Sequence, residues 1–283
     1  RGLWIAADIG PTVSFQTTFY ENQAVLSSYL YQHAQITGSI PGQGRIKDFG
    51  QRGLDFAWAM GNVSWSPKPW LNAQVGNGRH FVGNGYRSAL LSDNTAPYPY
   101  IKLSALTTNK RLQYTVIHAK FNMVREVDRL PTGDAGESLF YWKRATMHHL
   151  SVSVGKRLQL GLFEASLWKN IGADGGEPYD ALELNPLIGV NTVVNGFQGP
   201  GKQLIGLDAK WRVGRRNVLY GQFALDDPER ERYAWQAGVR LFDVAGVKDL
   251  HLQLEYDQAT PFAYTGAEAR MNSTHGGQAL AQQ

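Results

Sequence analysis

The histidines and paired carboxylates are the residue types from which catalytic and metal sites are built. His148 and His149 form the one adjacent histidine pair in the sequence. Neighbouring residues of a strand point to opposite faces, so this pair does not predict a shared metal ion. A run of four carboxylates surrounds Pro228, and we interpret it as a solvated turn rather than a calcium site. The four are Asp226, Asp227, Glu229 and Glu231.

Glu255 and Asp257 lie two positions apart, which places both carboxylates on one face of an expected strand. Such a pair can perform acid–base chemistry, but we expect it to pair with Arg212 or Arg240 instead. No GxSxG elbow or P-loop is present. The glycine-rich segment 76–83 is not followed by the helix that a dinucleotide site requires. The sequence therefore predicts no enzyme, no metal site and no cofactor.

Composition leaves two classes of β protein open. The 283 residues include 18% charged and 12% aromatic residues, no cysteine and a net charge of +4. No apolar run approaches the roughly 18 residues of a spanning helix. The basic residues are dispersed, which argues against nucleic-acid binding. A soluble β protein and a transmembrane β-barrel both fit, because barrel strands alternate apolar and polar residues.

Alternation of apolar and polar residues recurs along the chain and predicts about twelve strands, several of them as long as bilayer-spanning strands. The segments 204–213 and 250–257 show it most clearly. Short and long connections alternate between the expected strands. This parity is typical of an outer-membrane barrel, with tight turns on the periplasmic side and long loops outside. Short helices are expected at 24–35 and within 178–194, and no strand pattern follows residue 258.

The expected fold is therefore an all-β, transmembrane antiparallel β-barrel that forms a single domain over residues 1–283. One face of its strands is apolar and suits lipid, and the other suits a wet lumen. The residues expected to face the lumen are Asp208, Lys210, Arg212, Arg240, Gln253, Glu255 and Asp257.

The stretch 76–103 contains four glycines near its start and a Pro-Tyr-Pro-Tyr run near its end. We expect its central part, 79–97, to be an outer loop that fills or caps the pore, with Leu90 and Leu91 as a small core. Arg79 and Arg87 are expected to pair with lumenal carboxylates. The residues expected to form the plug or to contact a ligand are Arg79, Asn84, Tyr86, Arg87, Asp93 and Asn94.

Several segments together are similar to the capsule-assembly Wzi-like outer-membrane protein family, closest to its gliding-motility RemB branch. They are RHFVGNGYRSALLSDNTAPYPYIKL at 79–103, GLFEASLWKN at 161–170, ELNPLIG at 183–189, LIGLDAKWRV at 204–213, LYGQFALDD at 219–227 and LQLEYDQATPFAYT at 252–265.

The resemblance implies a bacterial outer-membrane barrel whose lumen is occluded by inserted loops and short helices. It further implies a non-enzymatic role in polysaccharide binding, capsule assembly, surface adhesion or gliding motility. The alternatives are a structural subunit of a larger outer-membrane secretion or motility complex and, less favoured, a diffusion channel. Expected partners are outer-membrane lipid, surface polysaccharide and other outer-membrane proteins, and no nucleic acid. Family barrels are larger, so we expect this chain to be a fragment that lacks C-terminal strands.

Overall fold

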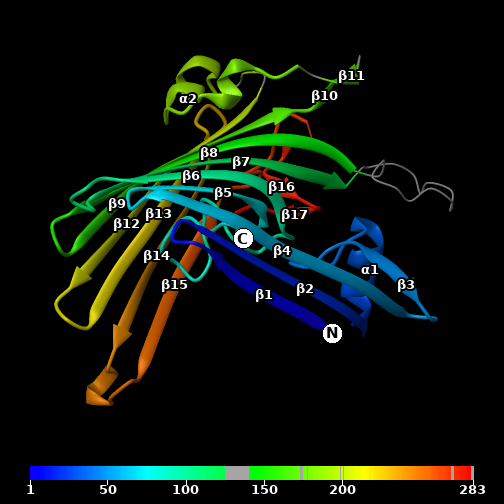
Figure 1. Ribbon diagram of the computed structural model, residues 1–283, viewed down its shortest axis with the longest axis horizontal. Coiled ribbons are helices and arrows are strands. Elements are labelled where there is room, and N and C mark those ends of the chain that lie inside the picture. The colour runs from blue at the N-terminus through cyan, green and yellow to red at the C-terminus, as the bar shows by residue number, and fades with distance from the viewer. Residues whose placement is uncertain are drawn as a thin grey trace.

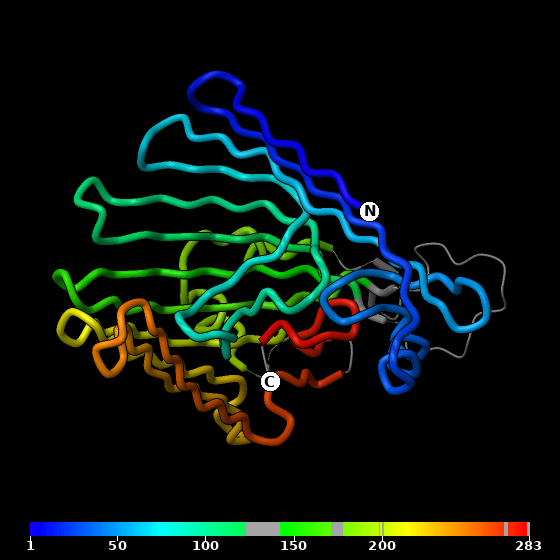
Figure 2. The backbone as a smooth tube through the Cα atoms, turned by 90° about the horizontal axis from the view of Figure 1, so that it is seen from below, coloured from blue at the N-terminus to red at the C-terminus, as the bar shows by residue number. Residues whose placement is uncertain are grey.

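The computed structural model describes residues 1–124, 140–172, 175–176, 178–197, 199, 201–268 and 271–281. Thirteen strands form one antiparallel sheet that curves around an interior space (Figures 1 and 2). In sheet order the strands are β1 (Gly2–Ile9), β2 (Val13–Val25), β4 (Gly53–Lys68), β5 (Leu71–Gly78), β6 (Tyr98–Leu106), β7 (Leu112–Val124), β8 (Phe140–Val154), β9 (Leu158–Lys169), β12 (Lys202–Val213), β13 (Asn217–Asp227), β14 (Arg232–Phe242) and β15 (His251–Ala259), with β3 (Ile46–Phe49) beside β4.

Nearly every strand pairs with the one that precedes it in the chain, as in an up-and-down barrel. Among the described residues no pairing joins β1 to β15, so the sheet is open between these two strands. Tight turns join the strands at one end, for example at 10–12 and 155–157, and long connections such as 79–97 join them at the other. The alternation of short and long connections predicted from the sequence is confirmed.

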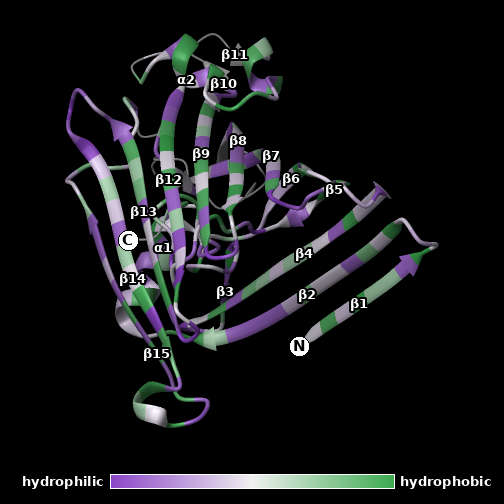
Figure 3. Ribbon diagram, turned by 90° about the vertical axis from the view of Figure 1, so that its left-hand side faces the viewer, coloured by the Kyte–Doolittle hydropathy of each residue, from purple (hydrophilic) through white to green (hydrophobic). Residues whose placement is uncertain are grey.

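Hydrophobic and hydrophilic residues alternate along the strands (Figure 3), and the two faces of the sheet differ in the way the sequence predicts. The convex face exposes large apolar side chains, including Val75 at 56%, Leu207 at 53% and Trp211 at 51%. Contiguous apolar exposure on this scale is characteristic of a surface that meets lipid. Asp208 faces the concave side, where it is only 5% exposed. Lys210 and Arg212 follow it on the same face, because strand residues two apart share a side.

The helices lie in the long connections. They are α1 (Ser28–Thr37), η2 (Ala181–Leu184) and α2 (Val190–Asn195), with a 3-10 turn η3 (Val244–Gly246) between β14 and β15. The helix expected at 24–35 begins later because Ala24 and Val25 still pair with β4. None of the described helices is both long and apolar enough to cross a membrane.

Two segments fill part of the interior. One is the connection 79–97, hereafter the constriction loop. The other is the C-terminal segment, residues 260–268 and 271–281, which contains the small strands β16 (Thr274–His275) and β17 (Gln278–Ala279). Figure 2 shows both on the concave side of the sheet. Their apolar side chains form one core with the inner faces of the strands, so the sequence analysis missed a second interior segment.

Candidate functional site

The constriction loop is fixed to one wall of the lumen, formed by β12 to β15. Asn84 Nδ2 donates to Asp208 Oδ1 at 3.0 Å, and Arg240 Nη2 donates to the carbonyl oxygen of Asn84 at 2.7 Å. Asn84 is thus bonded to β12 and to β14, the strands on either side of β13. Hydrogen bonds to charged groups in a low-dielectric interior contribute more than neutral ones, so these contacts hold the tip of the loop firmly.

Glu255 of β15 binds the loop backbone. Its carboxylate accepts the N–H of Tyr86 at 2.8 Å and that of Arg87 at 3.4 Å. The hydroxyl of Tyr220 donates to the same carboxylate at 2.6 Å. Gln236 Nε2 bridges Glu255 and the carbonyl oxygen of Arg87 at 3.1 and 3.0 Å. The backbone polar groups at this turn are therefore satisfied by lumenal side chains rather than by water.

The glycines of the loop are explained by close approach to this wall. Gln222 Oε1 accepts the N–H of Ala89 at 2.7 Å, which draws the loop onto β13. A Cβ on Gly83 would lie 1.7 Å from Gln222 Nε2, and one on Gly85 would lie 2.2 Å from Gln236 Oε1. Gly83 also has a φ of +132°, a backbone conformation that other residues rarely adopt. Both glycines let the backbone lie directly on the glutamines.

The expected small core at Leu90 and Leu91 is confirmed. Both side chains are at most 2% exposed and belong to the interior cluster. Leu90 fits above Gly206 of β12, where an added Cβ would approach its Cδ2 to 2.2 Å. Tyr264 of the C-terminal segment donates its hydroxyl to the carbonyl oxygen of Ala89 at 2.7 Å. The two interior segments therefore brace each other.

The expected pairing of Arg79 and Arg87 with lumenal carboxylates is wrong. The Arg87 guanidinium lies 5.1 Å from the ring centroid of Tyr86. Arg79 donates to the carbonyl oxygen of Gly42 and lies 5.5 Å from the ring of Trp58. The carboxylate of Glu255 is already occupied by backbone and hydroxyl donors, which reach it at a lower cost in side-chain entropy than a long arginine does.

The expected pairs of Glu255 and Asp257 with arginines of the wall are also wrong. Arg240 bonds the loop carbonyl of Asn84 instead, and Asp257 accepts from Gln236 Nε2 at 2.6 Å. Among the predicted loop residues, Tyr86, Asp93 and Asn94 are exposed. The structure thus brings Asn84, the backbone at Tyr86 and Arg87, Asp208, Arg240 and Glu255 together, and leaves Asp93, Asn94 and Arg212 apart from them.

The opposite wall of the lumen is hollow. A space of about 650 Å³ lies between the start of the constriction loop and β1 to β6, and a second of about 350 Å³ lies against β6 to β9. Arg79, His80 and Lys102 line both spaces. The loop therefore narrows the lumen from one side and leaves a lined passage along the other.

This passage is basic. Among the described residues that line the two spaces, Asp8 is the one carboxylate, whereas Arg79 and Lys102 are both cations. Burial, together with the nearby Lys102 ammonium, lowers the pKa of His80 to about 4, so its imidazole is neutral near pH 7. Its ring meets Tyr100 edge-on, with centroids 4.2 Å apart. His80 thus contributes an uncharged ring to the lining of the passage, and Arg79 and Lys102 give the passage its positive charge.

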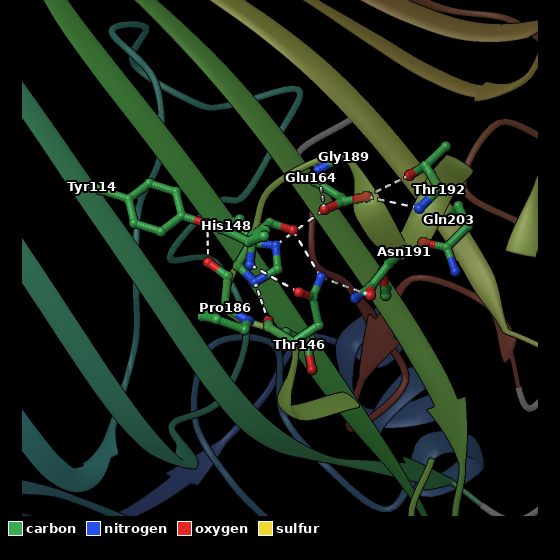
Figure 4. A network of polar contacts seen from close by, with 12 residues as sticks. Tyr114, Thr146, His148, Glu164, Pro186, Gly189, Asn191, Thr192 and Gln203 are labelled. Carbon is green, nitrogen blue, oxygen red and sulfur yellow. Dashed lines mark hydrogen bonds and ion pairs between the residues drawn. The ribbon is translucent and has the colours of Figure 1, made fainter. Parts of the chain in front are cut away.

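A second polar cluster lies on the outward-facing side of β8 and β9, where it bonds the connection between β9 and β12 to these strands (Figure 4). His148 Nδ1 lies 3.0 Å from Glu164 Oε2, and His148 Nε2 lies 3.0 Å from the carbonyl oxygen of Asn185. Both ring nitrogens are occupied and the side chain is fully buried, so the dyad has no free nitrogen for a general base. His149 contacts Asp208 at 3.0 Å on the other face, which confirms that the two histidines diverge.

The interpretation of Asp226 and Asp227 as a solvated turn is wrong. They are 3% and 5% exposed. Strand β13 extends through both residues, and the C-terminal segment covers them. Asp226 pairs with Lys202 and accepts the N–H of Tyr264 at 2.9 Å. The covering segment has no strand pattern of its own, so sequence reasoning left these carboxylates exposed to solvent.

No protein-family model and no curated protein matches the chain. Among solved structures, OccK3 (OpdO) of Pseudomonas aeruginosa is similar with a TM-score of 0.50 and 11% identity over 92% of this chain. A BenF-like porin of Pseudomonas fluorescens Pf-5 has a TM-score of 0.37 and 10% identity, and the match covers 92% of this chain and 72% of that one. The outer membrane protein opdK of P. aeruginosa has a TM-score of 0.33 and 11% identity, and the match covers 89% of this chain and 73% of that one. The chain spans 65% of the length of OccK3.

The protein is a bacterial outer-membrane β-barrel. Its antiparallel topology, its apolar convex face and the fold shared with OccK3 agree on this point, and the predicted fold class and location are confirmed.

The expected function is contradicted by the same comparison. A role in polysaccharide binding, capsule assembly, adhesion or gliding has no support in the similarity to OccK3. The low rank given to a diffusion channel was therefore wrong. The resemblance to the Wzi-like family and the expected partners stay predictions.

Proposed function

We propose that this barrel is a diffusion channel that passes small anionic solutes. Its pathway runs along the wall formed by β1 to β9, beside the constriction loop. One observation carries the proposal: the loop is bonded to β12–β15, while the opposite wall is hollow and basic. Arg79 and Lys102 lie where the two spaces meet, so a solute that passes the loop encounters both cations.

The charge arrangement favours anions for a simple physical reason. In a narrow passage with low-dielectric walls, fixed charges of one sign raise the local concentration of solutes of the other sign. Glu255 and Asp208 remain negatively charged, but both accept hydrogen bonds from the constriction loop, whose donors partly screen these two charges. The shared fold with OccK3 supports a porin-type barrel, and the named residues support the selectivity.

Solute uptake by proteoliposomes tests this function. Vesicles that contain the refolded protein are mixed with aliphatic monocarboxylates, neutral sugars of similar size or monoamines. The proposal predicts faster swelling with carboxylates than with amines. Equal, protein-independent rates for all three solutes would contradict it.

A further inference from the structure

The connection between β9 and β12 lies on the outside of the barrel. We call residues 178–195 the outer-wall loop. Glu164 of β9 accepts the N–H of Gly189 at 2.7 Å and the N–H and hydroxyl of Thr192 at 2.9 and 2.7 Å (Figure 4). Tyr114 of β7 donates to the carbonyl oxygen of Pro186 at 2.6 Å. The loop is therefore bonded to outward-facing side chains of the strands.

The side of this loop that faces away from the barrel is apolar. Leu184, Leu187, Val193 and Val194 are 67%, 62%, 85% and 63% exposed. The loop covers polar, outward-facing side chains of the strands, and its own outward side exposes leucine and valine side chains. Its surface thus extends the apolar convex face that carries Val75, which indicates contact with the hydrocarbon region of the membrane.

A groove of about 400 Å³ lies between the outer-wall loop and β5 to β8. Its walls are mainly apolar and aromatic, with Val75, Ile101, Trp142, Tyr179 and Leu184 among them.

Two cations line the same groove. Lys120 of β7 and Arg144 of β8 are cross-strand neighbours. They lie toward the end of the sheet that carries the long connections, which is the outer side. The Lys120 ammonium lies over the Trp142 ring, and the Arg144 guanidinium lies 4.2 Å from the ring centroid of Tyr179. Arg144 Nε also pairs with Glu183 Oε2 at 2.8 Å, which orients the guanidinium.

We propose that this groove binds one lipid of the outer leaflet that carries a phosphate and a net negative charge. An acyl chain packs between Ile101 and Leu184, and the phosphate lies at Lys120 and Arg144. Three observations favour this occupant: the groove is continuous with the lipid-facing surface, its cations lie at the outer end, and aromatic rings flank them. Arginine and lysine bind phosphate through charge-assisted hydrogen bonds, and basic pockets on membrane proteins bind lipid head groups in this way. Trp and Tyr are enriched at the level of the head groups.

Native mass spectrometry of the whole chain in mild detergent tests this site. The probes are phosphatidylglycerol, phosphatidylcholine with the same acyl chains, and inorganic phosphate. We expect one phosphatidylglycerol to be retained, at least about fivefold more than phosphatidylcholine, since each cation near the head group strengthens binding of an anionic lipid. Inorganic phosphate is not retained, because the acyl chain contributes most of the apolar contact.

Two variants locate the site. Lys120→Gln is expected to lower phosphatidylglycerol retention about fivefold, whereas the control Lys156→Gln, in an exposed turn at the opposite end of β8, leaves it unchanged. Leu184→Asn, at a position exposed enough to tolerate the change, is expected to lower retention of both lipids. Equal retention of the two lipids by the parent chain, or unchanged retention in Lys120→Gln, would overturn the proposal. A dimer mass lost in Leu184→Asn would instead assign this face to a second copy.

Discussion

The backbone N–H of Tyr86 donates to the carboxylate of Glu255 at 2.8 Å, and this bond joins the constriction loop to β15, the last strand of the sheet. Tyr220 and Gln236 hold the same carboxylate from the neighbouring strands. The loop is thus fixed to one side of the lumen by a side chain 169 residues away in the sequence. That asymmetry leaves the passage along the other side.

Removing the charge of Glu255 is expected to loosen the loop. Glu255→Gln retains the shape of the side chain but weakens its bonds to the Tyr86 N–H and the Tyr220 hydroxyl. Charged hydrogen bonds contribute about 1.5–3 kcal/mol each, so we expect a comparable loss in the free energy of unfolding and larger fluctuations of single-channel current. Planar-bilayer recording and urea titration measure the two effects. Asp257→Asn is the control on the same strand, because Asp257 accepts from Gln236 of β14 at 2.6 Å rather than from the backbone of the constriction loop. Equal noise in the two variants would contradict the assignment.

The close approach of Gly83 to Gln222 predicts a specific steric defect. Gly83→Ala places a Cβ where Gln222 Nε2 now lies, and overpacking of this kind costs about 1–3 kcal/mol. The expected result is a lower urea midpoint at an unchanged slope. The double variant Gly83→Ala with Gln222→Ala removes the clash and is expected to recover part of the loss. It does not recover all of it, because the φ of +132° remains unfavourable for alanine. A double variant less stable than both single variants would show that the clash is not the cause.

Two interior histidines predict a dependence of stability on pH. Burial lowers the pKa of His80 and of His275 to about 4, with the Lys102 ammonium beside the first and the Lys143 ammonium near the second. The folded state binds protons less readily than the unfolded state, whose histidines titrate near 6.5. The stabilisation is complete above pH 6.5 and is lost as the pH falls toward 4, by up to about 3 kcal/mol per histidine.

Urea titrations at pH 7.0, 5.5 and 4.5 measure this dependence. His80→Gln is expected to flatten the curve, because a group whose pKa is lowered in the folded state is removed. The exposed His33 supplies the control His33→Gln, which should follow the parent curve. A parent chain whose stability does not change between pH 7.0 and 4.5 would rule out buried neutral histidines at these positions.

Glu164 is expected to govern the attachment of the outer-wall loop. Glu164→Gln can still accept from Thr192 through its amide oxygen but loses its charge, and its NH2 group then faces the N–H of Gly189. We expect the loop at 185–195 to become accessible to protease at least about tenfold faster, while the β-sheet spectrum by circular dichroism stays unchanged, because opening of a loop requires only local unfolding. Glu229→Gln, in an exposed turn, is the control. Loss of the whole β-sheet signal would mean that Glu164 supports the sheet itself rather than the loop.

The sequence predicted the features that depend on periodicity. Alternation in 204–213 placed Asp208 on the lumenal face, and the parity of connections placed 79–97 at the outer end. These rules follow from strand geometry and need no partner information. Leu90 and Leu91 were assigned to a small core on the same local grounds.

The contacts that depend on exact loop geometry were not predictable. Opposite charges suggested arginine–carboxylate pairs, but the carboxylate of Glu255 instead accepts hydrogen bonds from the backbone N–H groups of Tyr86 and Arg87. The burial of Asp226 depends on a C-terminal segment that carries no strand pattern. One signal was present for the outer-wall loop. Arg144, Thr146 and His148 occupy alternate positions of one strand, where a lipid-facing side would be apolar, so a covering segment is required.

The most direct test of the central claim is the reversal potential of the channel in a planar bilayer under a tenfold KCl gradient. The parent channel is expected to prefer chloride. In Lys102→Glu the ion selectivity is expected to shift toward potassium, because this change inverts the charge where the two lumenal spaces meet. Lys110→Glu, in the exposed turn between β6 and β7, should leave the reversal potential unchanged. A parent channel that prefers potassium, or a Lys102→Glu channel with the parent's reversal potential, would contradict the claim that anions pass along this wall.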